Sequence, residues 1–176
     1  MHLRPATPAD TLAIAEIHTD NWRRIYRGLL DDAYLTGPIQ QERLAVWSGR
    51  ISAPPASQSL MVAERDERIL GFSCAYGAED PRWGSHLANL HVARSAQRQG
   101  VGRELMRAVA QWAAAAYPGA GLFLWVVEAN AGARRFYELM GGASVEADVW
   151  HAPDGSAIAK LRYAWPDPLL VGSPAG

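Results

Sequence analysis

The chain has 176 residues, of which 49% are hydrophobic and 20% are charged, and its formal net charge is −1. This balance suits one globular domain with a full-sized core and argues against disorder. The near-zero net charge excludes a global field that would recruit nucleic acid or an anionic membrane, so we expect neither as a partner.

The N-terminal part of the chain reads as a short strand followed by helices. After a strand at 2–6, Thr7-Pro8-Ala9-Asp10 combines a capping residue, a proline at the first helical position and an acidic first turn. Apolar residues then recur at helical spacing, which predicts further helical segments at 22–35 and 39–51.

The middle of the chain reads as three strands and a helix. Residues 60–65 and 69–78 have the pattern of an antiparallel hairpin around the polar turn Asp66-Glu67-Arg68. A second turn at 80–84 leads into a strand at 86–92. From Gly102 onward the apolar positions mark one face of a helix, which Pro118-Gly119 ends.

The C-terminal part reads as strand, helix and hairpin. Residues 122–127 form a continuous apolar run, short enough for a buried strand. Asn130 caps the next helix, and Gly141-Gly142 closes it. Strands at 144–151 and 157–164 follow, joined by the turn Ala152-Pro153-Asp154-Gly155.

This order of elements predicts a single α/β domain at 1–165 with a mainly antiparallel sheet, followed by a C-terminal tail at 166–176 without regular structure. Cys74 is the single cysteine, which excludes an intramolecular disulfide and a cysteine-based zinc site. The histidines are scattered without ligand spacing, so we expect no metal. No signal peptide or membrane span is evident, and we expect a cytoplasmic protein.

The stretch between the strand at 86–92 and the following helix carries the most specific signal. Its sequence is Gln97-Arg98-Gln99-Gly100-Val101-Gly102. Backbone N–H groups and the helix dipole favour an anion there, and the glycines let a phosphate approach closely. A P-loop is excluded because the only lysine is Lys160, and the dinucleotide fingerprint fails because Leu105 replaces its third glycine. Taken alone, the hexapeptide could also be a turn that binds nothing.

A second motif follows further along the chain, Asn130-Ala131-Gly132-Ala133-Arg134-Arg135-Phe136-Tyr137-Glu138-Leu139-Met140-Gly141. With the glycine turn and the opening Leu3 to Asp10, it resembles the GNAT superfamily of N-acetyltransferases over residues 2–165. The resemblance implies a mixed, mainly antiparallel central sheet of about seven strands flanked by helices. In that fold two parallel strands splay apart, here those at 86–92 and 122–127.

The resemblance also implies acetyl-CoA as co-substrate. Its pantetheine arm would lie between the splayed strands, and the glycine turn would hold its pyrophosphate. The implied cofactor-binding residues are Leu90, His91, Val92, Gln97, Arg98, Gln99, Gly100, Val101, Gly102, Arg103, Asn130, Ala133 and Tyr137.

Direct attack of a neutral amine on a thioester needs a base for the amine proton and an acid for the departing thiolate. Tyr137 matches the acid position of the family, although a tyrosine there could also only pack against the cofactor. His86 is the candidate base, with Glu79, an ordered water or no base at all as alternatives. Strict alternation along the strand places His86 on the face of Ala88, Leu90 and Val92, and Leu87, Asn89 and His91 on the other.

We expect a primary amine of a small molecule as acceptor, with a peptide N-terminus as the alternative. Trp22 and Tyr26 are candidate substrate contacts, or else plain helix core. A non-catalytic acyl-CoA-binding module, acting as a sensor or partner-binding protein, would keep the glycine turn but need neither Tyr137 nor a base. Homodimers are frequent in the family, and the hairpin around 145–163 is the expected contact.

Overall fold

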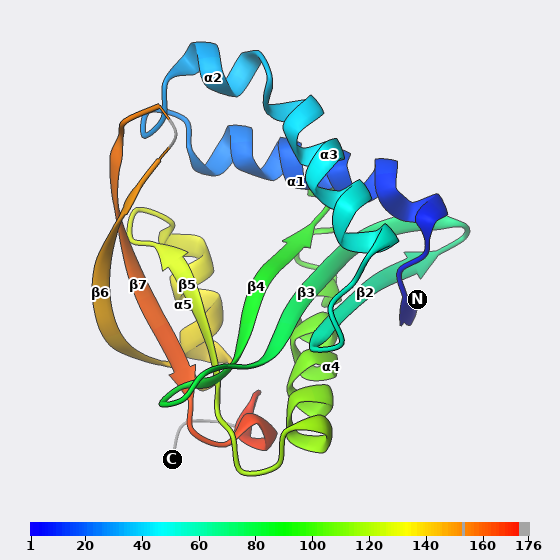
Figure 1. Cartoon of the computed structure of the whole chain (residues 1–176), viewed down its shortest axis with the longest axis vertical. Helices are drawn as coiled ribbons and strands as arrows, with labels where there is room; N and C mark the ends of the chain where they lie inside the picture. The colour runs from blue at the N-terminus through cyan, green and yellow to red at the C-terminus, as the bar shows by residue number, and fades with distance from the viewer. Residues whose placement is uncertain (153, 173–176) are drawn as a thin grey trace.

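The computed structural model describes residues 1–152 and 154–172, and it contains one sheet with helices on both faces (Figure 1). The strands are β1 His2–Pro5, β2 Gln58–Arg65, β3 Arg68–Asp80, β4 Gly84–Val92, β5 Leu122–Val127, β6 Ala143–His151 and β7 Ala157–Trp165. The helices are α1 Thr11–Ile25, α2 Asp32–Thr36, α3 Ile39–Ser52, α4 Val101–Ala116 and α5 Ala131–Leu139, with 3-10 turns η1 Pro8–Asp10, η2 Arg94–Ala96 and η3 Pro168–Leu170.

The sheet has the order β1-β2-β3-β4-β5-β7-β6, and every neighbouring pair is antiparallel except β4 and β5. The expected mixed, mainly antiparallel α/β sheet is therefore confirmed. Helices α1 and α3 cover one face, where Trp47 packs against Phe72 of β3. Helices α4 and α5 cover the other face, in a core that contains Met106 and Tyr163.

The helix expected at 22–35 is wrong. Helix α1 continues through Trp22 to Ile25, and α2 is only one turn long. Between them Gly28 has φ +75°, a left-handed conformation that interrupts a right-handed helix. Asp31 then starts α2 as its N-cap, because its side chain accepts a hydrogen bond from the Ala33 N–H at 2.6 Å. Trp22 and Tyr26 thus lie at the C-terminal end of one helix.

Strict alternation along β4 is also wrong, because the strand contains a β-bulge. Asn89 pairs with Cys74 and Leu87 pairs with Ala75, so Ala88 is an extra residue opposite β3. The bulge moves His86 to the face of Asn89 and His91, whose partners Tyr76, Cys74 and Phe72 all pack on the α1–α3 side. Leu87 and Leu90 pack on the α4 side.

The C-terminal part departs from expectation in the tail. Residues 166–172 were expected to lack regular structure, but they include η3 and a core residue, Val171, which is 8% exposed. Residues 173–176, and Pro153 of the predicted hairpin turn, lie outside the described residues. On either side of Pro153, the Gly155 N–H donates to the Ala152 carbonyl at 2.9 Å. None of the helices in 1–152 and 154–172 has the length and apolarity to span a membrane.

Candidate functional site

The two parallel strands of the sheet form a fork. Strands β4 and β5 pair only at Ser85 with Leu122 and at His86 with Phe123. Beyond these pairs they diverge, and Figure 1 shows β4 leaning toward β3 while β5 follows β7. Beyond these pairs, no strand in 1–152 or 154–172 pairs with the inner backbone edges of the fork, and an extended ligand could hydrogen-bond to them as a strand would.

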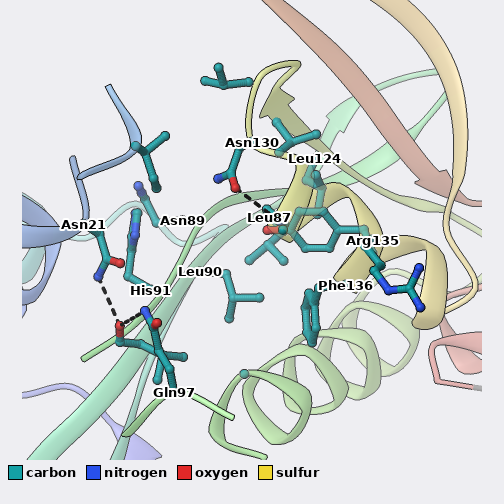
Figure 2. A pocket seen from close by; sticks show the side chains of 18 of the residues that line it. Asn21, Leu87, Asn89, Leu90, His91, Gln97, Leu124, Asn130, Arg135 and Phe136 are labelled. Carbon is teal, nitrogen blue, oxygen red and sulfur yellow. Dashed lines mark hydrogen bonds between the residues drawn. The ribbon is translucent and has the colours of Figure 1, made fainter. Parts of the chain in front are cut away.

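A cavity of about 1370 Å³ occupies the fork, and Figure 2 shows side chains that line it. Its lining residues 87–92 come from β4, and 124–127 come from β5. The cavity continues past the glycine turn on one side and past the end of α1 on another. Its volume is large enough for a cofactor-sized ligand.

All charged side chains in the lining are arginines, namely Arg24, Arg98, Arg103 and Arg135. No aspartate or glutamate of the described residues lines the cavity. A surface with several guanidinium groups and no counter-charge attracts a polyanion. The protein as a whole is nearly neutral, so this positive charge is local to the cavity.

The glycine turn gives the cavity a backbone anion site. Arg98 has φ +61° and Gly100 has φ +84°, so left-handed residues alternate with ordinary ones just before α4 begins at Val101. Such alternation points successive N–H groups into one concavity, at the positive end of the α4 dipole. The arrangement suits a phosphate or pyrophosphate group.

The implied cofactor-binding residues line this cavity with two exceptions. Val101 is 1% exposed and packs in the core under the turn. Gln99 points outward, where its side-chain amide donates to the Ser95 carbonyl at 2.8 Å. The binding role of the whole set stays a prediction.

Helix α5 brings Tyr137 to the cavity. Asn130 caps the helix by accepting a hydrogen bond from the Ala133 N–H at 3.2 Å, as the motif predicts (Figure 2). Two turns later Tyr137 is 9% exposed and lines the cavity. Burial raises the pKa of its phenol above the ordinary value, so the hydroxyl keeps its proton at neutral pH. It can therefore act as a proton donor.

His86 and Glu79 form a pair at the closed end of the fork. The Nδ1 atom of His86 lies 2.9 Å from Oε1 of Glu79, and the imidazole stacks on Phe123 at 4.7 Å between ring centroids. Burial lowers the pKa of His86, and the Glu79 carboxylate works in the opposite direction. The two candidate bases are thus one unit. Neither lines the cavity itself; they lie beside the point where the strands separate.

The two candidate substrate residues line the cavity near the end of α1. The ring of Trp22 lies 4.7 Å from that of Tyr26, and both contact Trp150 of β6. These three rings make this wall of the cavity aromatic. Burial raises the pKa of Tyr26 to about 12, so the wall is also uncharged at neutral pH.

Sequence reasoning missed several residues of the cavity. Asn21 donates to the Val92 carbonyl at 3.1 Å, and Arg24 follows one turn later on α1. Arg135 of α5 and Trp125 of β5 also line the cavity. The two α1 residues carry no local signal, because only the packing of α1 against the end of β4 brings them there. Arg135 stands within the second motif, but at one of its variable positions.

Comparisons with known proteins agree with this geometry. The family model described as "Acetyltransferase (GNAT) family" matches residues 14–141. YuaI of Bacillus subtilis, named as an uncharacterized N-acetyltransferase, is 26% identical over 94% of this chain and 92% of that protein. The protein named "Probable N-acetyltransferase Rv2775" of Mycobacterium tuberculosis is 30% identical over 78% of this chain and 77% of its own length.

A solved structure shares the fold. The structure described as "yncA, a putative ACETYLTRANSFERASE from Salmonella typhimurium with its cofactor Acetyl-CoA" superposes with a TM-score of 0.65 at 17% sequence identity. The match covers 100% of this chain and 96% of that one.

Proposed function

Because the chain belongs to the acetyltransferase (GNAT) family and acetyl-CoA is its co-substrate, we propose that this N-acetyltransferase acetylates the primary amine of a small molecule. The observation that carries the proposal is the cavity in the β4–β5 fork. It offers arginines and a backbone anion site at one end and an aromatic wall at the other. The first end suits the phosphates of the donor, and the second suits a compact acceptor.

Closure of the aromatic end favours a small acceptor over a peptide. The β6–β7 hairpin reaches across to the loop before α2, where Asp154 accepts a hydrogen bond from the Asp31 N–H at 2.7 Å. Apolar residues on both sides of this contact, including Leu30 and Ile158, form one buried cluster. An extended peptide would have to open this contact to pass through, whereas a small amine would not.

The acetyl donor supplies a thioester, and the residues of this chain supply binding and proton transfer. We infer that the inner edges of β4 and β5 hold the pantetheine arm and that the glycine turn holds the pyrophosphate. The amine nitrogen attacks the thioester carbonyl, forming the C–N bond while the C–S bond breaks. The products are an amide and CoA, and no covalent enzyme intermediate is needed.

Two protons move in this step, one from the amine and one to the departing thiolate, and we assign a residue to each. His86 does not line the cavity, so it takes the amine proton through an intervening water. It uses Nε2 for this, because Nδ1–H is held by the Glu79 carboxylate. Glu79 is therefore a positioning residue. It fixes the tautomer and orientation of the imidazole and raises the pKa of the imidazolium against the effect of burial. Tyr137 donates its proton to the departing thiolate.

The test measures CoA release from acetyl-CoA over a panel of small amines and short peptides. We expect turnover of small amines, and a loss of about tenfold or more in kcat for Tyr137→Phe with CoA affinity retained. Tyr117→Phe, outside the cavity lining, is the matched control and keeps activity. Turnover of peptide N-termini alone would contradict the small acceptor. CoA binding without any turnover would contradict the acceptor proposal and the assigned chemistry together.

The His86–Glu79 pair has its own readout in the pH dependence of kcat/KM. Glu79→Gln keeps an acceptor for Nδ1–H but removes the charge that raises the pKa of His86. That pKa therefore falls, and the acidic limb of the profile moves to lower pH while the plateau drops. Glu104→Gln, which removes an exposed carboxylate paired with Arg107, leaves the limb in place. An unmoved limb in Glu79→Gln would remove His86 from proton transfer.

The cytoplasmic location and the homodimer stay predictions. Val145 and Val149 of β6 are 39% and 46% exposed, which leaves apolar surface on the hairpin for a contact between copies. Light scattering of the purified protein measures the oligomeric state, and a monomer at micromolar concentration would contradict the dimer.

A further inference from the structure

Among the residues that the structure describes, Arg24 is the one charged residue of the cavity that comes from the N-terminal half of the chain. It lies in the last turn of α1, and its guanidinium hydrogen-bonds two neutral groups, the Asn21 side-chain oxygen and Oε1 of Gln97, the latter at 3.3 Å. Gln97 is the first residue of the glycine turn. Among residues 1–152 and 154–172, no carboxylate forms an ion pair with Arg24.

The position of Arg24 is fixed by its neighbour one turn earlier. The side-chain amide of Asn21 donates to the Val92 carbonyl at 3.1 Å and to the Ile17 carbonyl at 2.8 Å. Asn21 therefore fastens α1 to the end of β4, immediately before the glycine turn. Since residues three apart share a helix face, Arg24 is held beside that turn.

The charge of Arg24 faces the cavity without local compensation. Burial is the larger cause that lowers the pKa of His91 on β4 to about 4, and the charge of Arg24 is the second cause. A guanidinium has five N–H donors in a planar fork that matches phosphate oxygens, and two amide oxygens do not use all of them. Arg24 contacts Gln97, the first residue of the left-handed turn, so the guanidinium and the N–H groups of that turn border the same part of the cavity. Both surfaces favour an anion bound there.

We propose that Arg24 binds an oxygen of the acetyl-CoA pyrophosphate, so that α1 provides one side of a site whose other side is the glycine turn. The inference rests on the acetyl-CoA dependence of the protein and not on the identity of its acceptor. Asn21 and Gln97 hold the guanidinium in place before the phosphate arrives, which lowers the conformational cost of binding. Helix α1 also carries Trp22, so one helix contributes both to the phosphate site and to the aromatic wall.

The test compares ligands that contain or lack the phosphates. Calorimetry measures the Kd of CoA, 3′-dephospho-CoA and pantetheine for the wild type and for Arg24→Met. We expect the Kd of CoA and of dephospho-CoA to rise about tenfold or more in Arg24→Met, the usual effect of losing a charge-assisted hydrogen bond. The Kd of pantetheine stays the same, because pantetheine has no phosphate for Arg24 to contact.

Two further variants keep the result specific. Arg27→Met removes an exposed arginine just after α1 that does not line the cavity, and we expect it to leave all three Kd values unchanged. Arg24→Lys retains the charge without the fork and should restore part of the CoA affinity. Rising salt weakens CoA binding less in Arg24→Met than in the wild type.

Three outcomes would overturn the inference. The first is an unchanged Kd for CoA in Arg24→Met, and the second is an equal loss for pantetheine. In the third, the loss for CoA disappears with dephospho-CoA, which would assign the contact to the 3′-phosphate. None of them depends on finding an acceptor. Failure of the wild type to bind CoA would instead contradict the acetyl-CoA dependence.

Discussion

Replacing Gly100 by alanine tests the glycine turn through its backbone alone. Gly100 has φ +84° and ψ −8° as the N-cap of α4, and a Cβ placed there would meet nothing within 4 Å. No clash or lost contact therefore accompanies Gly100→Ala. What remains is the cost of holding alanine in the left-handed region, roughly 1–2 kcal/mol.

This cost can take two forms. If the turn stays in place, the free energy of unfolding falls by the whole cost and the CoA affinity is unchanged. If the turn relaxes to negative φ, the N–H groups turn away from the cavity, and CoA must restore them when it binds. The Kd then rises by up to about 5- to 30-fold, the equivalent of about 1–2 kcal/mol. In either case the two losses of free energy should add to about 1–2 kcal/mol.

Gly119→Ala is the matched control. Gly119 has φ +83°, a Cβ there also meets nothing within 4 Å, and the residue lies in the loop after α4, outside the cavity lining. It should lose the same stability, measured by urea unfolding, and keep the CoA affinity measured by calorimetry. A summed loss for Gly100→Ala below about 0.5 kcal/mol would refute the strain argument. A change of CoA affinity in Gly119→Ala would refute the assignment of the effect to the turn.

Three further predictions concern stability. Trp47→Phe removes the indole donor that lies 2.9 Å from Nδ1 of buried His18. We expect the free energy of unfolding, measured with urea, to fall by about 2 kcal/mol. Leu12→Ala, at an exposed position, is the control and should change it little. Burial lowers the pKa of His18 to about 2 and that of His91 to about 4, so the unfolded chain binds more protons below its own pKa near 6.5. Stability is therefore full above pH 6.5 and falls as the pH is lowered, by about 2 kcal/mol per histidine at pH 5; equal unfolding free energies at pH 7 and pH 5 would contradict this. Gly71→Ala places a Cβ 2.6 Å from the His91 carbonyl oxygen, so β4 must shift. We expect the free energy of unfolding to fall by about 1–3 kcal/mol. An unchanged melting temperature would show that β4 moves without cost.

Much of the candidate site could be predicted from local sequence. The glycine turn, the Asn130 cap and Tyr137 all lie where their motifs indicate, because each depends on residues within one or two turns. The helix expected at 22–35 failed for a local reason as well. Gly28 was the signal of the break, but the apolar residues around it continued a helical pattern.

The faces of β4 could not be predicted in this way. Alternation assumes a regular strand, and the bulge at Ala88 arises from the register in which β4 pairs with β3, the strand before it. The same pairing brings His86 to the side of Glu79, so two residues considered as rival bases form one hydrogen-bonded pair. Their separate roles follow from the hydrogen bond between them, and the spacing of the two residues along the sequence does not predict that bond.

The sequence by itself determined the order of strands and helices, the family and the anion-binding turn, because propensity, capping and glycine conformations act over a few residues. Only the tertiary structure decided how far β4 and β5 pair, and therefore where the cavity opens. It also decided that Arg24 lies beside the glycine turn, because that depends on Asn21 packing α1 against the end of β4. These contacts join segments far apart in the chain, and their free energy comes from packing the whole sheet and its helices together.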